Sequence, residues 1–259
     1  METPLIIIAL AAFITALLTF FSGFGLGTIL TPVFVLFFPV EMAIALTGTV
    51  HFLNNIFKLA LIGKHANAGV ILRFGIPAII AALGGAWLLM HLSELEAWFT
   101  YSLMGKSYSI TPVRLIIAVL LLFFAFTELV PLLKSLKINK KALMVGGAFS
   151  GFFGGLSGHQ GALRSIFLIK LGLSKEAFIA TGVVIACFID ISRLSVYYTG
   201  MDSSGLLEEW PAIVTAALSA FTGAFMGKRL LKKLTLSFIQ KLVAFLMMAI
   251  AVGLGMGVI

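Results

Sequence analysis

The stretch Gly154-Gly155-Leu156-Ser157-Gly158-His159-Gln160-Gly161 interrupts an apolar run, 142–172, that is too long for one straight transmembrane helix. A second overlong run, 4–37, contains Ser22-Gly23-Phe24-Gly25-Leu26-Gly27 and then Pro32. Glycine clusters at membrane depth unwind a helix, and lipid tolerates such backbone only where protein buries it or where it lines a cavity. The sequence therefore predicts two broken helical segments whose breaks lie inside the protein.

Composition fixes the class of protein. The chain has 259 residues, of which 61% are hydrophobic and 11% charged, whereas soluble domains carry roughly a quarter charged residues. A soluble domain, a disordered chain and a disulfide scaffold are excluded, the last because Cys187 is alone. Long apolar runs instead of short alternating strands predict an all-α polytopic membrane protein. Six further runs read as ordinary spans: 43–63, 70–91, 110–133, 176–198, 207–228 and 236–258.

The net charge of +8 does not indicate a nucleic-acid partner. The cations form short clusters between apolar runs, a pattern that sets membrane orientation and contacts anionic lipid. The first run lacks a basic region and a small-residue cleavage site, so we expect it to remain in the mature protein.

The chain repeats itself with an offset of 134 residues. Ala43, Thr47-Gly48 and Val50 recur as Ala177, Thr181-Gly182 and Val184, Pro77-Ala78-Ile79 recurs as Pro211-Ala212-Ile213, and Gly27 matches Gly161. Phe21-Ser22-Gly23-Phe24 also reappears as Phe149-Ser150-Gly151-Phe152, displaced by an apparent insertion. Two weakly similar halves with corresponding broken segments are typical of transporters. The predicted halves are 1–134 and 135–259.

The loop charges indicate how these halves lie. Basic clusters follow the second run, join the halves and precede the last run, whereas the other loops are acidic or nearly neutral. All basic clusters fall on one side, the cytoplasm, only if both broken segments enter the membrane and return. Each half then makes an odd number of crossings, which predicts two inverted repeats. Each repeat would contain one re-entrant segment and three transmembrane helices, with both chain termini outside.

Polar residues inside apolar spans are costly and are commonly functional. Run 43–63 holds His51, Asn54, Asn55 and Lys58, and run 176–198 holds Asp190 and Arg193, whose spacing of three lets them pair on one helix face. Structural roles remain open for all of these: a packing salt bridge for the pair, and core hydrogen bonding for the histidine and asparagines.

The second break offers more specific chemistry. Freed backbone N–H groups at the start of a half-helix favour anions, and an arginine fork suits an oxyanion. We therefore expect a small anion to be held by Arg193 or Arg164 with His159, Gln160 and backbone amides. The full set of candidate substrate-binding residues is His51, Asn54, Asn55, Ser157, Gly158, His159, Gln160, Arg164, Asp190 and Arg193, with Gly25 and Gly27 from the first break.

Enzymatic chemistry is not predicted. Gly155-Leu156-Ser157-Gly158 matches the GxSG of intramembrane serine proteases, but no histidine follows this serine on a later helix to act as its base. Four scattered histidines and one cysteine do not form a metal site, and there is no nucleotide-binding loop. The sequence thus predicts no cofactor. Glycine-faced helices leave room for a homodimer, although nothing specifies which face would pair.

Gly23-Phe24-Gly25-Leu26-Gly27, followed by Pro32 and the Ala43…Thr47-Gly48 stretch, resembles the GxGGG…P signature of the TauE/SafE sulfite exporter family. The resemblance covers about residues 10 to 250. It implies export of a small sulfur oxyanion or organosulfonate, such as sulfite or sulfoacetate, across the bacterial inner membrane. Two positions depart from the pattern: Leu26 replaces a glycine, and the second copy carries the polar residues His159 and Gln160.

The resulting hypothesis is a secondary transporter that exports a small sulfur-containing anion by alternating access. The alternatives are a channel or importer for another small anion, and a membrane assembly or sensor protein whose broken helices only pack.

Overall fold

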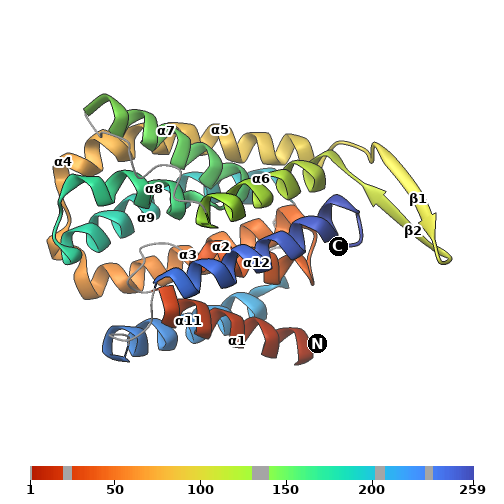
Figure 1. Ribbon diagram of the computed structural model, residues 1–259, viewed down its shortest axis with the longest axis horizontal. Coiled ribbons are helices and arrows are strands. Elements are labelled where there is room, and N and C mark those ends of the chain that lie inside the picture. The colour runs from red at the N-terminus through yellow and green to blue at the C-terminus, as the bar shows by residue number, and fades with distance from the viewer. Residues whose placement is uncertain (1, 20–24, 130–139, 202–207, 231–235) are drawn as a thin grey trace.

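The computed structural model describes residues 2–19, 25–129, 140–201, 208–230 and 236–259, and most of these are helical (Figure 1). The first half contains α1 (Glu2–Thr19), α2 (Leu26–Val35), α3 (Val40–Ile62), η1 (Gly63–His65), α4 (Ala68–Val70), the π-turn η2 (Ile71–Gly75), α5 (Ile76–Ser93), β1 (Phe99–Leu103), β2 (Lys106–Ile110) and α6 (Pro112–Leu129). The second half contains α7 (Lys140–Ser157), α8 (Gln160–Leu168), η3 (Ile169–Leu171), α9 (Lys175–Gly200), α11 (Trp210–Leu230) and α12 (Leu236–Gly255).

Four described stretches are long and apolar enough to cross a membrane: Val40–His65, Ala68–Ser93, Lys175–Gly200 and Trp210–Gly227. They correspond to four of the six predicted ordinary spans. The other two, 110–133 and 236–258, correspond to α6 and α12, whose described apolar parts are shorter. The predicted all-α polytopic membrane protein is confirmed.

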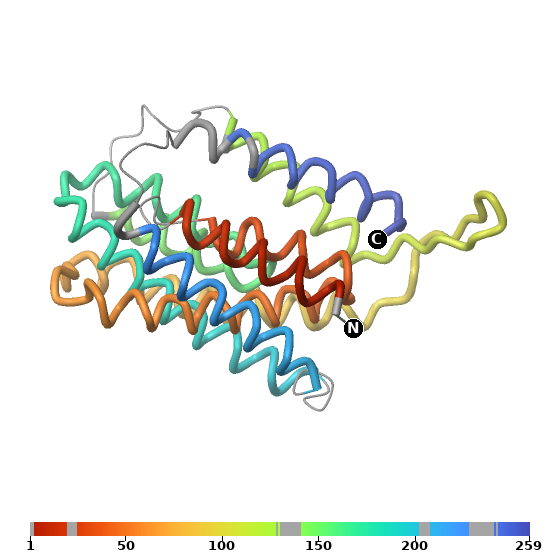
Figure 2. The backbone as a smooth tube through the Cα atoms, turned by 90° about the horizontal axis from the view of Figure 1, so that it is seen from below, coloured from red at the N-terminus to blue at the C-terminus, as the bar shows by residue number. Residues whose placement is uncertain are grey.

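The long helices lie side by side along one axis, and both chain termini lie at the same end of the bundle (Figures 1 and 2). α1 starts at this end, and the start of α2 lies beside the end of α1, because a Cβ on Gly25 would be 3.2 Å from the Cβ of Thr19. α2 then returns toward the end where α3 begins. α1 and α2 therefore lie side by side within the bundle, an arrangement compatible with the re-entrant segment that the loop charges predict.

Run 142–172 also forms a hairpin, made of α7 and α8. A Cβ on Gly146 would lie 2.6 Å from the ring of Phe167, and one on Gly154 would lie 2.8 Å from the Cβ of Gln160, so the two helices run antiparallel. The break itself is shorter than the glycine-rich stretch predicts, because only Gly158 and His159 separate the two helices.

The other glycines of this stretch serve packing. Gly147, Gly151 and Gly155 are four residues apart on α7, and each faces a backbone carbonyl of η2 or α5. A side chain at any of them would collide with that backbone, so glycine lets the two helices approach closely. The second copy of the repeated tetrapeptide, Phe149-Ser150-Gly151-Phe152, thus lies inside α7. Its proposed mate, Phe21-Ser22-Gly23-Phe24, is outside the described residues.

Helix starts repeat with the offset seen in the sequence. α2 and α8 begin at Leu26 and Gln160, and α5 and α11 begin at Ile76 and Trp210, in both cases 134 residues apart. The helix contacts correspond between the proposed repeats: α5 packs on α7 and α9, and its counterpart α11 packs on α1 and α3. These contacts are what an internal duplication predicts. The boundary between the proposed halves, at 134–135, lies outside the described residues.

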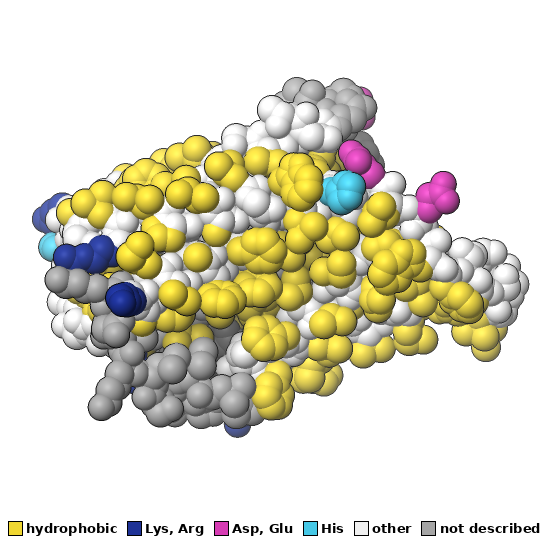
Figure 3. All heavy atoms as spheres, turned by 90° about the horizontal axis from the view of Figure 1, so that it is seen from above, with side chains coloured by type: hydrophobic (Ala, Val, Ile, Leu, Met, Phe, Trp, Pro, Cys, Tyr) yellow, Lys and Arg dark blue, Asp and Glu magenta, His cyan; other side chains and the backbone are white. Residues whose placement is uncertain are grey.

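Charged side chains separate to the two ends of the bundle, with an apolar surface between them (Figure 3). Basic residues gather at the end formed by η1 and the start of α7, opposite the chain termini, while acidic residues gather at the end of α5 (Figures 1 and 3). Glu176, Lys106 and Arg114 depart from this separation.

The sequence analysis missed the hairpin β1–β2, which projects from the bundle beside the termini (Figure 1). Its strands pair antiparallel around Met104 and Gly105, which have φ angles of 50° and 77°. Two short alternating runs around a two-residue turn ending in glycine are a hairpin signal, and the sequence contained it.

Candidate anion-binding site

The two helix breaks meet in the interior. A Cβ on Gly27, in the first turn of α2, would lie 3.3 Å from the carbonyl oxygen of Gly158 and 3.9 Å from Cδ2 of His51. A Cβ on Gly158 would lie 3.2 Å from NH1 of Arg193. The starts of α2 and α8 therefore converge beside a buried guanidinium group.

Both breaks use a glycine in the left-handed region of backbone space. Gly25 has a φ of 117° and Gly158 a φ of 81°. Other residues adopt such angles at a cost of about 1–2 kcal/mol, so glycine allows each chain reversal without strain. Gly25, however, faces Thr19 on α1 and does not face the convergence of the two breaks.

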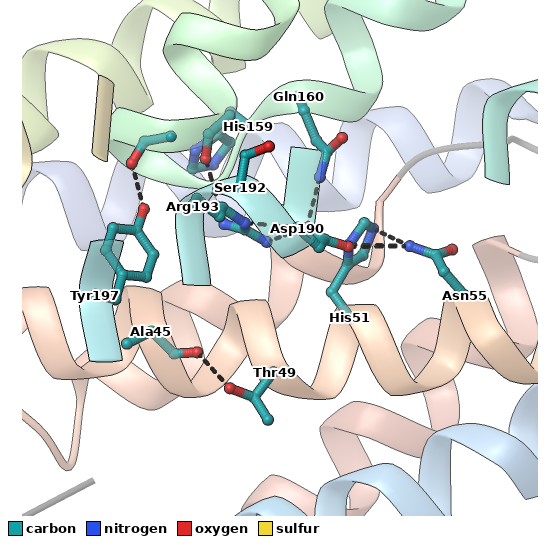
Figure 4. Close-up of polar contacts among 12 residues, drawn as sticks. Ala45, Thr49, His51, Asn55, His159, Gln160, Asp190, Ser192, Arg193 and Tyr197 are labelled. Atoms are coloured by element: carbon teal, nitrogen blue, oxygen red, sulfur yellow. Dashed lines mark hydrogen bonds and ion pairs between the residues drawn. The ribbon is translucent and has the colours of Figure 1, made fainter. Parts of the chain in front are cut away.

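Asp190 is the centre of a buried hydrogen-bond network that includes His51, Asn55, Gln160 and Arg193 (the Asp190 network; Figure 4). Its Oδ2 accepts from Nδ1 of His51 at 2.7 Å and from the Asn55 amide at 3.4 Å. Its Oδ1 accepts from the Gln160 amide at 2.8 Å and from Nε and NH2 of Arg193 at 3.0 and 2.8 Å. The network therefore joins α3, α8 and α9.

The Asp190–Arg193 ion pair predicted from the spacing of three is present. Both side chains are fully buried. Burying an ion pair costs about as much as the attraction returns, whereas removing one partner costs about 3–5 kcal/mol because a charge is left uncompensated. The pair is thus better explained by the position it gives the guanidinium group than by stability.

Cations exceed anions in the described interior. Lys58, Arg164 and Arg193 are 7%, 3% and 0% exposed, while Asp190 is the one carboxylate among the described buried residues. NH1 of Arg164 donates to Oε1 of Gln160 at 3.0 Å, which links it to the Asp190 network. The interior is net positive, and this favours an anionic ligand.

Arg193 lies between two glycines. A Cβ on Gly48 of α3 would be 3.2 Å from its Cζ, and a Cβ on Gly158 would be 3.2 Å from NH1. Nε and NH2 are held by Asp190, and NH1 has one long hydrogen bond, 3.3 Å, to the carbonyl of Gly154. NH1 is therefore the part of the fork that faces the break before α8.

His159 lies in the break itself and is 1% exposed. Its ring stacks on Phe124 of α6 with 5.1 Å between centroids, and its Nδ1 lies 2.8 Å from the carbonyl oxygen of Ser157. Nε2 has no hydrogen-bond partner among the described residues.

Three other buried side chains have polar atoms without a hydrogen-bond partner among the described residues: Thr31 on α2, and Thr47 and Asn54 on α3. Thr31 Oγ1 would be 3.6 Å from a Cβ on Gly158, and Thr47 Cγ2 would be 4.0 Å from a Cβ on Gly27. Buried polar groups in proteins nearly always have partners, so unpartnered ones at one place need an explanation. Thr31 and Thr47 lie at the convergence of the two breaks, and Asn54 lies two helical turns after Thr47 on α3.

The remaining predicted residues have protein partners. Ser157 donates to the carbonyl of Phe153 on its own helix, and Gln160 and Asn55 are engaged in the Asp190 network. Sequence reasoning missed Thr31, Thr47, Phe124 and Tyr197, whose hydroxyl donates to the carbonyl of Gly155. Tyr197 could have been found, since it lies four residues after Arg193 on the same face of α9.

Comparison with known protein families gives one match. The family model described as Sulfite exporter TauE/SafE matches residues 8–254. The chain belongs to the TauE/SafE sulfite exporter family. The resemblance seen in the first glycine break is thereby confirmed, and with it a membrane transport class. Comparisons with curated proteins and with solved structures found no match.

Within this TauE/SafE protein, the departures from the family's glycine pattern are both buried. Leu26 is 2% exposed at the start of α2, and His159 and Gln160 are each 1% exposed at the start of α8. The polar residues of the second break therefore add interior hydrogen-bonding groups where the first break offers apolar packing.

Proposed function

We propose that this TauE/SafE protein exports a small sulfur oxyanion, sulfite or an organosulfonate such as sulfoacetate, by alternating access of two inverted halves. The observation that carries the proposal is the convergence of the α2 and α8 starts beside NH1 of Arg193, where the buried residues that the structure describes include three cations and one carboxylate. Helix starts and a guanidinium group both favour oxyanions.

The separation of basic and acidic side chains to opposite ends of the bundle supports an orientation of the protein in the membrane. Because basic loops stay in the cytoplasm, the end formed by η1 would be cytoplasmic, and both termini would face outward. An inside-negative potential contributes about 2.3 kcal/mol per charge per 100 mV toward outward movement of an anion.

The test is flux of sulfite, sulfoacetate, taurine and chloride in proteoliposomes. We expect flux of a sulfur oxyanion. Chloride flux without it would identify an anion channel of different selectivity, and no flux from folded protein would favour the assembly or sensor alternative.

A double variant links flux to the site. Asp190→Asn with Arg193→Gln removes both charges of the ion pair together, so no lone charge is left buried. We expect this variant to fold and to lose sulfur-oxyanion flux. Lys141→Gln, at an exposed position of the basic end, is the control with unchanged flux. Equal flux in both variants would remove Arg193 from the site.

A further inference from the structure

The tautomer of His159 defines what its free nitrogen can bind. Nδ1 lies 2.8 Å from the carbonyl oxygen of Ser157. A carbonyl oxygen only accepts hydrogen bonds, so Nδ1 carries the hydrogen. In the neutral ring, Nε2 then has a lone pair and no hydrogen, and it acts as an acceptor.

The surroundings favour the neutral ring. No carboxylate among the described residues bonds to His159, and both oxygens of Asp190 are already engaged by the Asp190 network. Arg193 lies within electrostatic reach of the ring, so an imidazolium would add a further positive charge to an interior that already has an excess. Burial of such a charge without a partner is costly.

An acceptor is the wrong group for a bare anion. The oxygens of a fully deprotonated oxyanion would meet the Nε2 lone pair and be repelled. NH1 of Arg193 and the hydroxyl of Thr31, which would lie 3.2 and 3.6 Å from a Cβ on Gly158, are donors that suit the anionic oxygens. His159 directly follows Gly158 in the break, and one acceptor together with two donors matches a ligand that combines negative charge with one hydrogen to donate.

We propose that the site takes a monoanionic sulfur oxyanion that carries a donatable hydrogen, such as hydrogensulfite or a sulfonate with a neighbouring hydroxyl, and that His159 Nε2 accepts this hydrogen while Arg193 NH1 and Thr31 hold the oxygens. This rests on the proposed function. His159 therefore acts as an acceptor that selects among anions, and not as a source of positive charge.

Selectivity follows from the cost of the unsatisfied acceptor. A buried acceptor without a partner is costly, and a site built to receive a hydrogen rejects the analogue that lacks it. A ligand with the hydrogen is expected to bind about tenfold or more tightly than a matched ligand without it.

The experiment compares isethionate with ethanesulfonate, which differ by one hydroxyl group, as competitors of sulfite binding to the purified full chain at one pH. The wild type is expected to bind isethionate at least tenfold more tightly. His159→Phe keeps an aromatic ring for stacking on Phe124 but has no acceptor, and should bind the two equally. His159→Gln, whose amide oxygen can accept, should restore part of the preference.

The outcomes separate the two proposals. The inference fails if the wild type binds sulfite but does not bind isethionate more tightly than ethanesulfonate. It also fails if that preference persists in His159→Phe, because His159 would then not select the hydrogen. Tighter ethanesulfonate binding as pH falls would show an imidazolium and would also overturn it. If folded wild type binds none of the three anions, the proposed function itself fails.

Discussion

Replacing Gly158 with alanine would test whether the space beside Arg193 belongs to the anion path. Gly158 has a φ of 81°, and a Cβ there would lie 3.2 Å from Arg193 NH1 and 3.6 Å from Thr31 Oγ1. The backbone strain of alanine in the left-handed region is about 1–2 kcal/mol. The methyl group would also occupy the position from which an anionic oxygen would contact NH1.

Gly172 provides the matched control, because its φ of 65° imposes the same kind of strain while a Cβ there would meet nothing within 4 Å. We expect Gly158→Ala and Gly172→Ala each to lose about 1–2 kcal/mol of unfolding free energy, measured by chemical unfolding in detergent. Only Gly158→Ala should lose sulfite flux in proteoliposomes, by at least about tenfold, since a lost charge-assisted contact is worth about 1.5–3 kcal/mol.

The comparison between these two variants is decisive. If Gly158→Ala transports as well as Gly172→Ala, the anion does not pass Arg193 NH1, and the proposed site is in the wrong place. If both lose transport equally, strain in the chain reversals is responsible, and filling the space beside Arg193 has no separate effect.

Three further predictions follow from the same contacts. Asp190→Asn alone should lower the unfolding free energy by about 3–5 kcal/mol because Arg193 is left buried without its carboxylate, and adding Arg193→Gln should restore much of it, as measured by chemical unfolding in detergent. Single cysteines at Glu94 and Lys141 should react with an impermeant reagent from opposite sides of the membrane. Reaction of both from one side would contradict the placement of the acidic and basic ends of the bundle on opposite sides. Tyr197→Phe, which removes a hydroxyl that donates to the α7 backbone, should cost about 1 kcal/mol of stability and leave flux unchanged; lost flux would place Tyr197 in the anion path.

Much of the fold could be predicted because membrane burial leaves a strong signal. Apolar runs of span length located the long helices to within a few residues, and each run that was too long for one helix is divided into two helices, α1 with α2 and α7 with α8. Glycine runs were less specific. Gly154 and Gly155 looked like part of the break, but they belong to α7, since close helix packing and chain reversal use the same residue for different reasons.

Most of the site's residues could be predicted individually, but the contacts that join them into one site could not. Asp190 and Arg193 were paired from their spacing, because neighbours on one helix are fixed by helix geometry. The hydrogen bond from His51 joins residues 139 positions apart, and no local pattern encodes it. Thr47 was noticed only in the internal repeat and the family pattern, and neither it nor Thr31 was predicted as a site residue. A threonine in an apolar run commonly bonds to its own helix, and only the packed structure shows that these two do not.

The proposed halves match in where α2 and α8, and α5 and α11, begin, but they differ in charge distribution, and this bears on how the proposed alternating access would work. At the offset of 134, the second-half residues Gln160, Arg164, Asp190 and Arg193 correspond to Leu26, Leu30, Ile56 and Leu59 in the first half. Two symmetric anion sites are therefore not expected. The contact from the first half to Asp190 comes from His51 and Asn55 on α3, whereas Arg193 and Gln160 hold Asp190 from its own half. If α3 and α9 separate during transport, the bonds from α3 must break while the others persist, so Arg193 and His159 would keep their contacts to the anion and the contact from Thr31 on α2 would be the one to break.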